Sequence, residues 1–171
     1  YNYFPEGKDQ MLFDILDTLH EELHRVTKEA FDPDNGSFAS ALERYVEAFL
    51  EFFMGKEDLF VISMKENNRF AFGDDPSKAT YFKEQHKRYK DVLEPNVELA
   101  IASGDLKPFS PKAITNMILG NVHGYLRYHC MTKVGIAESD CELPSARDAA
   151  KFISEMLISG FGTAKTPTQT N

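Results

Sequence analysis

The sequence predicts an all-α fold of about six helices in one domain, and three observations lead to this prediction. Apolar residues recur at helical spacing along most of the chain, and no stretch alternates cleanly enough between apolar and polar residues to be assigned as a strand. Clusters of Gly, Pro, Asp and Asn divide these periodic segments at intervals that suit helices. The 171 residues suffice for one domain with a hydrophobic core, and no change of composition along the chain suggests a second domain.

Short breaks separate the first three expected helices. The stretch DPDNG at 32–36 consists of residues that favour turns, so the first helix ends there. Ser37, directly after it, is a suitable N-cap for the second helix because its hydroxyl can accept a hydrogen bond from a free backbone N–H. The three expected ranges are about 8–31, 37–54 and 57–70.

The second half of the chain is divided in the same way. GDDPS at 73–77 precedes a long fourth helix, in which Pro95 should force a kink or a restart because proline lacks a donor N–H. The pair 110–111, a Ser followed by a Pro, is a good N-cap with a proline at the first helical position. Pro144 or Ser145 starts the last helix. The three expected ranges are about 77–102, 111–133 and 145–162, and a loose polar tail follows at 163–171.

The composition excludes several classes of protein. Asp and Glu number 27 against 19 Lys and Arg, a formal charge of −8, so the chain should not bind nucleic acid through its overall charge. No apolar run reaches the roughly 18 residues of a membrane span, and the first residues lack the pattern of a signal peptide. Cys130 and Cys141 have no C-x-x-C spacing and form no disulfide framework, which fits a reducing cytosol. A cytoplasmic protein without a membrane partner is therefore expected.

The stretch HEELH at 20–24 has the spacing of a zinc site. On a helix it places His20 and His24 one turn apart, so that both can bind one Zn²⁺ while Glu21 activates a water molecule. The third ligand would be Glu43, which lies on the charged face of the second helix, opposite its apolar face. A zinc-dependent hydrolase is therefore an alternative without a well-placed third ligand. The other interpretations are two partly exposed histidines beside the core, or a histidine that lines a small-molecule cavity.

Other patterns of catalysis are missing from the sequence. It contains no G-x-S-x-G elbow, no glycine-rich phosphate loop, and no Cys with an obvious set of His and Asn partners. We therefore expect no enzyme, no metal and no cofactor.

Aromatic residues are abundant and unevenly distributed. The chain has 14 Phe and 7 Tyr without any Trp, and they concentrate in the second helix and along 60–89. Such a surplus in a six-helix domain either fills the core or lines an apolar cavity with a few polar groups.

The last two helices have wider apolar arcs than the others. When each residue is advanced by about 100°, the two arcs span roughly 200° and 180°, whereas a surface helix of a monomer buries roughly 100° to 140°. The excess predicts a four-helix interface between two copies of the chain, and Gly120 and Gly124 would let a second helix approach closely. The alternative is that both helices are central in a bundle. The residues expected at the dimer interface are Ile118, Val122, Leu126, Phe152, Ile153, Met156 and Leu157.

Two stretches of the chain resemble TetR-family transcriptional regulators. YNYFPEGKDQMLFDIL at 1–16 resembles the end of the family's helix-turn-helix unit, where an aromatic-rich segment leads into the first helix of the regulatory domain. IASGDLKPFSPKAITNMILGNVHGYL at 101–126 resembles the family's loop and the long helix after it. With the helix order and lengths, the resemblance covers essentially the whole chain. It implies a remnant of an otherwise absent DNA-binding head at 1–7, a ligand-binding and dimerisation domain at 8–162, and a loose tail at 163–171.

The resemblance also implies a mechanism and a set of site residues. In the family, the residues at the positions of Tyr3 and Lys8 contact DNA phosphates, and Lys8 stands at a helix N-terminus, which favours anions. A homodimer would hold two heads at the spacing of successive major grooves, and a largely apolar or aromatic effector would release such a repressor from operator DNA. A helical protein-interaction module without a ligand remains a further alternative. By position, the expected ligand-binding residues are His20, Phe49, Phe53, Met64, Phe82, His86, Tyr89, Met117, Asn121 and Tyr125.

Overall fold

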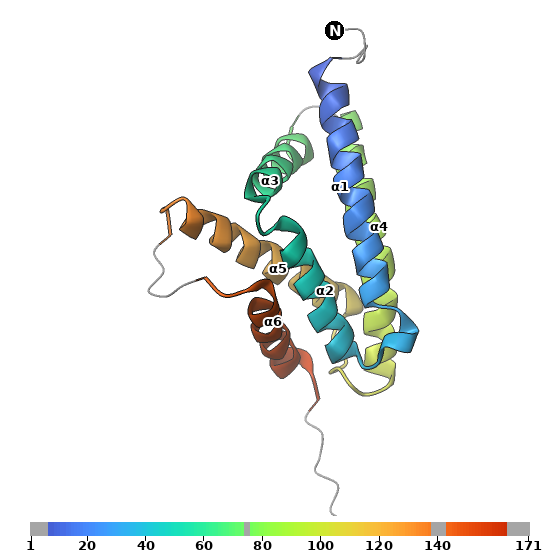
Figure 1. Ribbon diagram of the computed structural model, residues 1–171. Coiled ribbons are helices and arrows are strands. Elements are labelled where there is room, and N and C mark those ends of the chain that lie inside the picture. The colour runs from blue at the N-terminus through green and yellow to red at the C-terminus, as the bar shows by residue number, and fades with distance from the viewer. Residues whose placement is uncertain (1–6, 74–75, 138–142, 164–171) are drawn as a thin grey trace, which may run out of the picture.

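The computed structural model describes residues 7–73, 76–137 and 143–163, without the side chains of residues 9, 35, 77 and 78. This part of the chain contains six α-helices, one short 3₁₀ helix (η1) and no strand, which confirms the all-α prediction (Figure 1). None of these helices is both long and apolar enough to cross a bilayer. The elements are α1 (Lys8–Ala30), η1 (Pro33–Asn35), α2 (Phe38–Phe53), α3 (Glu57–Ala71), α4 (Pro76–Ala102), α5 (Pro111–Lys133) and α6 (Ala146–Phe161).

Several helices begin where local residue chemistry predicts. The Ser37 hydroxyl accepts a hydrogen bond from the N–H of Ser40 at 3.3 Å and starts α2. The Ser145 hydroxyl accepts one from the N–H of Asp148 at 3.2 Å and starts α6. Pro111 opens α5, where its missing N–H costs nothing, although the serine before it makes no side-chain cap bond. Three of the six α-helices of the described part therefore start at residues whose local chemistry favours a helix start.

α4 is one continuous helix from Pro76 to Ala102, so the restart expected at Pro95 does not occur. Pro95 is exposed, and so is Asp91, the residue whose carbonyl would have received the missing N–H. A carbonyl on the solvent side of a helix can bond to water instead, and the helix therefore continues through the proline.

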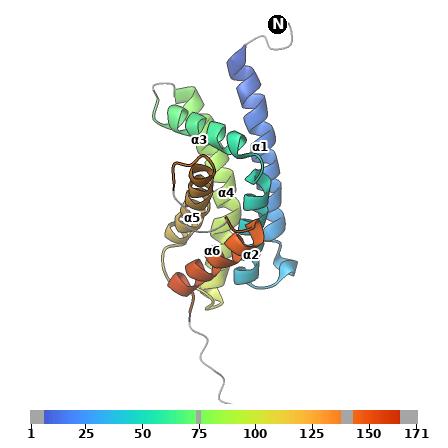
Figure 2. The ribbon, with the colours of Figure 1, turned by 60° about the vertical axis from the view of Figure 1, so that its left-hand side comes forward.

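α2 lies at the centre of the bundle. It packs against α1 on one side and α6 on another, and α4 and α5 also contact it (Figures 1 and 2). Leu42, Val46 and Leu50 lie on its inward faces and are fully buried. Burial of one such side chain stabilises the fold by roughly 1.5–3 kcal/mol, so the broad apolar face of α2 organises the main core.

α1 and α4 lie side by side over most of their length, in both views (Figures 1 and 2). The Tyr81 hydroxyl of α4 donates to the Asp17 carboxylate of α1 at 2.6 Å. One turn further along α1, the Arg88 guanidinium lies 2.9 Å from the Glu21 carboxylate. These polar contacts fix how the two long helices face one another.

A second, smaller core lies where α1, α3 and α4 meet. It consists of Leu16, Phe70 and Phe82, one residue from each helix, all buried. The Phe70 and Phe82 rings stack at 5.6 Å between centroids. α3 is thus fixed at its C-terminal end to α1 and α4, and the cavity described below is lined by residues of both cores.

The structure corrects the predicted dimer interface. Ile118, Val122 and Leu126 are fully buried within this chain, and Ile153 and Leu157 are buried as well. The reason is that α5 packs against α4 and α2, and α6 packs along α2, so the inner half of each apolar arc belongs to the chain's own core. Of the seven expected residues, only Phe152 and Met156 remain exposed, at 57% and 59%.

The segment after α4 is joined to the end of α6. Leu106 and Gly162 form an isolated antiparallel bridge. The N–H of Lys107 donates to the carbonyl of Phe161 at 2.7 Å, and the N–H of Thr163 donates to the carbonyl of Asp105 at 3.1 Å. Because Leu106 is also buried in the main core, this clasp connects the C-terminal ends of α4 and α6.

Candidate functional site

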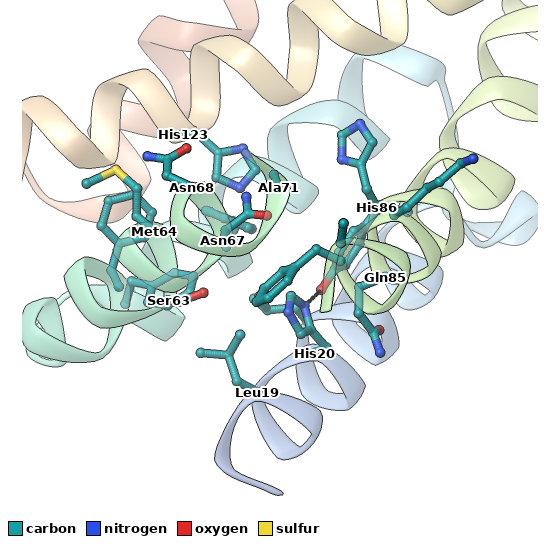
Figure 3. Close-up of a pocket in the computed structure, with 18 of the residues that line it drawn as sticks. Leu19, His20, Ser63, Met64, Asn67, Asn68, Ala71, Gln85, His86 and His123 are labelled. Carbon is teal, nitrogen blue, oxygen red and sulfur yellow. Dashed lines mark hydrogen bonds between the residues drawn. The ribbon is translucent and has the colours of Figure 1, made fainter. Parts of the chain in front are cut away.

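A cavity of about 620 Å³ lies between α1, α2, α3, α4 and α5 (Figure 3). Its volume lies within the range of small-molecule sites in proteins, roughly 300–1,000 Å³. The described residues that line it are Leu19, His20, Leu23, Tyr45, Phe49, Phe53, Phe60, Ser63, Met64, Asn67, Asn68, Ala71, Phe72, Ala79, Phe82, Lys83, Gln85, His86, Tyr89 and His123.

One wall of the cavity is aromatic. Phe49 and Phe53 of α2 lie 5.2 Å apart between ring centroids, and Phe60 of α3 lies 5.2 Å from Phe53 with its ring nearly perpendicular. All three rings are buried and belong to the main core. The wall therefore offers flat apolar surfaces to a ring or an alkyl chain.

His20 and Tyr89 form a polar pair on the wall made by α1 and α4. The Nδ1 atom of His20 lies 2.7 Å from the Tyr89 hydroxyl, while its Nε2 atom is buried without a hydrogen-bond partner in the described part of the chain. Burial lowers the pKa of His20 to about 4, and burial also raises the pKa of Tyr89. Both groups are therefore uncharged at neutral pH, and the hydrogen bond between them joins two neutral side chains.

His123 of α5 faces the cavity between two aromatic rings. Its ring meets Phe49 edge to face at 5.1 Å and lies nearly parallel to Phe60 at 6.5 Å. The ring is surrounded by protein yet keeps accessible surface, because that surface faces the cavity. Burial lowers the pKa of His123, so the imidazole is neutral. Its Nδ1 atom donates to the carbonyl of Leu119 at 2.7 Å, one turn earlier in α5.

Polar groups from α3 and α4 complete the lining. α3 contributes Ser63, Asn67 and Asn68, and α4 contributes Lys83 and Gln85. No carboxylate is among the described lining residues, although the chain has more acidic than basic side chains. The cavity can therefore hold a neutral apolar molecule with a few polar groups, or one with a negative charge near Lys83.

The structure brings most of the expected ligand residues together. His20, Phe49, Phe53, Met64, Phe82, His86 and Tyr89 all line the cavity. Met117, Asn121 and Tyr125 do not, because α5 turns a different face to it. Met117 and Asn121 point outward, and the Asn121 amide donates to the carbonyl of Met117 at 2.7 Å. Tyr125 packs half-buried against the main core.

Sequence reasoning did not assign His123 or the α3 amides to the site. His123 lies about 100° around α5 from its fully buried neighbour Val122, on the same face as buried Leu119. Asn67 and Asn68 are amides, which lie on the protein surface more often than in its interior, so the sequence carried no signal for them. The signal that could have found His123 is the Leu119 spacing, since residues four apart share one helix face.

HEELH does not form a zinc site with Glu43 in the described part of the chain, where no three His, Cys, Asp or Glu side chains gather as metal ligands. His20 faces Tyr89, whereas the Nδ1 atom of His24 lies 3.5 Å from the Arg88 guanidinium. The positive charge of Arg88 at this distance opposes the binding of a metal cation by His24.

Of the expected DNA contacts, Tyr3 lies outside the described residues. Lys8 is the first residue of α1 and its side chain is exposed. The structure thus leaves Lys8 accessible at a helix N-terminus, and its contact with phosphate stays a prediction.

Three solved structures are similar to this chain over most of its length. No family model matches the chain, and no curated protein matches it. KstR2, a ketosteroid transcriptional regulator of Mycobacterium tuberculosis, is similar with a TM-score of 0.71 and 14% identity, over 92% of this chain and 74% of its own. A TetR/AcrR-family transcriptional regulator from Thermobifida fusca is similar with a TM-score of 0.65 and 18% identity, over 92% and 76%. A protein of unknown function from Rhodococcus sp. RHA1 gives 0.70 and 16%, also over 92% and 76%.

The chain has the fold of the TetR/AcrR-family transcriptional regulators. At these identities the likeness defines the fold, and the function has to be argued from the cavity and the surface.

Proposed function

We propose that this chain is the sensor and dimerisation domain of a ligand-responsive transcriptional regulator, a repressor that leaves DNA when a small, largely apolar or aromatic molecule fills the cavity. The observation that carries the proposal is the aromatic cavity of about 620 Å³ inside this fold. KstR2, which shares the fold, is named for ketosteroids, and such apolar molecules suit a lining of this kind. The resemblance of 1–16 to the end of a helix-turn-helix unit supports the regulatory role.

The arrangement of α1 and α4 supports a way for the ligand to act. His20 and Tyr89 line the cavity and join the two helices by one hydrogen bond, so an occupant that displaces Tyr89 changes the α1–α4 contact. α1 begins at Lys8, next to the segment expected to lead to the DNA-binding head. A ligand that binds one arrangement of α1 more tightly than another shifts the population toward it, and the position of the heads changes with it.

The outward side of α5 and α6 supports the homodimer. Met117, Phe152 and Met156 are 57%, 57% and 59% exposed, which is unusual for such large apolar side chains. On α5, Gly120 and Gly124 have open space where a side chain would stand. We define these five residues as the α5–α6 face. Two copies of the face would bury apolar surface and allow close helix approach, as in a four-helix interface.

Sedimentation velocity tests the dimer. The chain is expected to sediment as a dimer, and the double variant Phe152→Lys with Met156→Lys is expected to sediment as a monomer, because four lysines would meet in each interface. Leu99→Lys is the matched control, since Leu99 is exposed on α4 and does not belong to this face. A dimer that survives the double variant, or a chain that is monomeric from the start, would refute this part of the proposal.

Transcript sequencing in the host tests the regulatory function. Deletion of the gene is expected to raise a small group of transcripts, and the cavity ligand is expected to raise the same group in wild-type cells only. The ligand is sought first by fluorescence of N-phenyl-1-naphthylamine, a neutral aromatic probe, and then by its displacement. If no transcript changes on deletion, the chain is not part of a regulator.

A further inference from the structure

The protonation pattern of His123 is fixed by its neighbour. A carbonyl oxygen carries no hydrogen, so the Nδ1 atom that lies 2.7 Å from the Leu119 carbonyl must be the protonated nitrogen. The neutral ring then carries a lone pair on Nε2. No described residue makes a hydrogen bond to that atom, and the ring opens toward the cavity (Figure 3). His123 thus offers a pure acceptor to whatever occupies the cavity.

We propose that the cavity selects ligands that carry a hydroxyl group, as a phenol or an alcohol does, and that the Nε2 atom of His123 accepts the hydrogen bond from this hydroxyl. The proposal rests on the ligand-binding function proposed above and specifies its ligand class. Phe49 and Phe60 on either side of the ring would hold the apolar body that bears the hydroxyl.

The other polar groups of the lining do not make this selection. Ser63, Asn67 and Asn68 each carry both donors and acceptors, so they can pair with either kind of ligand group. His20 pairs through Nδ1 with the Tyr89 hydroxyl, which can donate or accept, so its unpaired Nε2 atom on the wall of α1 and α4 has no fixed acceptor role. In His123 a backbone carbonyl fixes Nδ1 as the donor, so the cavity-facing Nε2 atom is the place where a ligand without a donor leaves a lone pair unpaired.

An ionised carboxylate does not satisfy the same atom. Its oxygen atoms carry lone pairs and no hydrogen, so they would be repelled by the lone pair of the Nε2 atom. Binding would then require a proton on His123, which the surrounding protein and the nearby His86 disfavour more than the bond to the Leu119 carbonyl favours it. Lys83 could receive an acid elsewhere in the cavity, and a test has to separate these two possibilities.

Isothermal titration calorimetry with three naphthalene derivatives tests the proposal. 2-Naphthol carries the donor, 2-methoxynaphthalene keeps the ring and the oxygen but lacks the donor, and 2-naphthoate carries a negative charge instead. Wild-type protein at pH 7.5 is expected to bind 2-naphthol about 10-fold more tightly than 2-methoxynaphthalene, since an acceptor that the bound ligand covers without pairing costs about a factor of 5 to 150. 2-Naphthoate is expected to bind no better than 2-methoxynaphthalene.

The variants assign the preference to one atom. His123→Phe fits between the same two rings and is expected to abolish the preference for 2-naphthol without weakening 2-methoxynaphthalene. His24→Phe, the matched control on α1 at a histidine outside the cavity lining, is expected to keep the preference. If His123→Phe does not fold, His123→Gln replaces it, and its amide oxygen should preserve part of the preference.

Three outcomes overturn the proposal in distinguishable ways. Equal binding of 2-naphthol and 2-methoxynaphthalene to the wild type overturns the selection by a donor. A preference that persists in His123→Phe places the acceptor on another residue, and tight binding of 2-naphthoate alone assigns the cavity to acids. If none of the three compounds and no N-phenyl-1-naphthylamine binds, the proposed sensor function itself fails.

Discussion

Replacing His20 by Asn should make the protein less sensitive to mild acid. The folded chain keeps His20 uncharged because burial lowers its pKa to about 4, against 6.5 for the unfolded chain. Arg88 also lowers this pKa, whereas Asp17 acts to raise it. Between pH 6.5 and 4 the unfolded state therefore binds more protons than the folded state, and the folded state loses stability as the pH falls through this range.

The magnitude follows from the two pKa values. With 6.5 unfolded and about 4 folded, the loss at pH 5 is about 2 kcal/mol, and it approaches about 3 kcal/mol below pH 4. Asn at position 20 keeps a polar atom near the Tyr89 hydroxyl but does not titrate in this range. The other histidines with lowered pKa values stay in both proteins, so the difference between the two proteins isolates His20.

Urea unfolding at pH 7.5, 6, 5 and 4.5 measures the effect. The free energy of unfolding of His20→Asn should fall less than that of the wild type between pH 7.5 and 5, by about 2 kcal/mol. His24→Asn is the matched control, because His24 is less deeply surrounded by protein and its variant should reduce the pH dependence less. Parallel curves for the wild type and His20→Asn would refute the assignment of His20 as a buried neutral group.

Three further predictions follow from the core, the cavity and one ion pair. Leu50→Ala, at a fully buried position of α2, should lower the free energy of urea unfolding by about 2–5 kcal/mol, whereas Leu99→Ala, at a site 68% exposed, should change it by less than about 0.5 kcal/mol. Ala71→Trp should weaken N-phenyl-1-naphthylamine fluorescence binding at least about 10-fold while leaving the melting temperature nearly unchanged, because an indole would occupy the cavity; unchanged binding would place the probe elsewhere. Burial acts to raise the pKa of Glu57, but hydrogen bonds from Lys133 and the Gly55 N–H outweigh it and lower this pKa to about 2. The stabilisation by Glu57 is therefore present above pH 4.5 and lost as the pH falls toward 2. Glu57→Gln should lower the free energy of unfolding by about 1 kcal/mol at pH 7 and should weaken the fall of the melting temperature below pH 4.5 in calorimetric scans. An unchanged pH dependence below pH 4.5 would contradict the assignment.

The helix boundaries could be predicted because they depend on residues close in sequence. Ser37 and Ser145 cap their helices by bonds to residues three positions on, and Pro111 fixes its own backbone angle. Pro95 shows the limit of this local reasoning. Whether a proline ends a helix depends on whether the freed carbonyl reaches solvent, and the packing of the whole bundle decides that.

The faces of α5 and α6 could be predicted only in part for the same reason. A wide apolar arc reveals that two surfaces are covered, but it does not reveal which part faces the chain's own core. Val122 is fully buried while Phe152 is 57% exposed, and both belong to arcs that look alike in sequence. For the same reason the sequence predicted that Met117 lines the cavity, whereas the structure places His123 of α5 there.

The candidate site divides along similar lines. Aromatic residues such as Phe49 and Phe82 were predictable, because large apolar side chains are more often buried than exposed and the resemblance gave their position. Asn67 and Lys83 were not, because polar side chains at a cavity look like solvated ones until the opposite wall is known.

The clasp between Leu106 and Gly162 anchors the C-terminal end of α6 to the segment that follows α4. Two backbone hydrogen bonds beside the bridge hold this end, and α6 also packs along α2. α6 therefore cannot move away from the end of α4 unless these hydrogen bonds break. A movement of the C-terminal end of α4 would thereby also move α6, the helix that carries the exposed side chains of Phe152 and Met156.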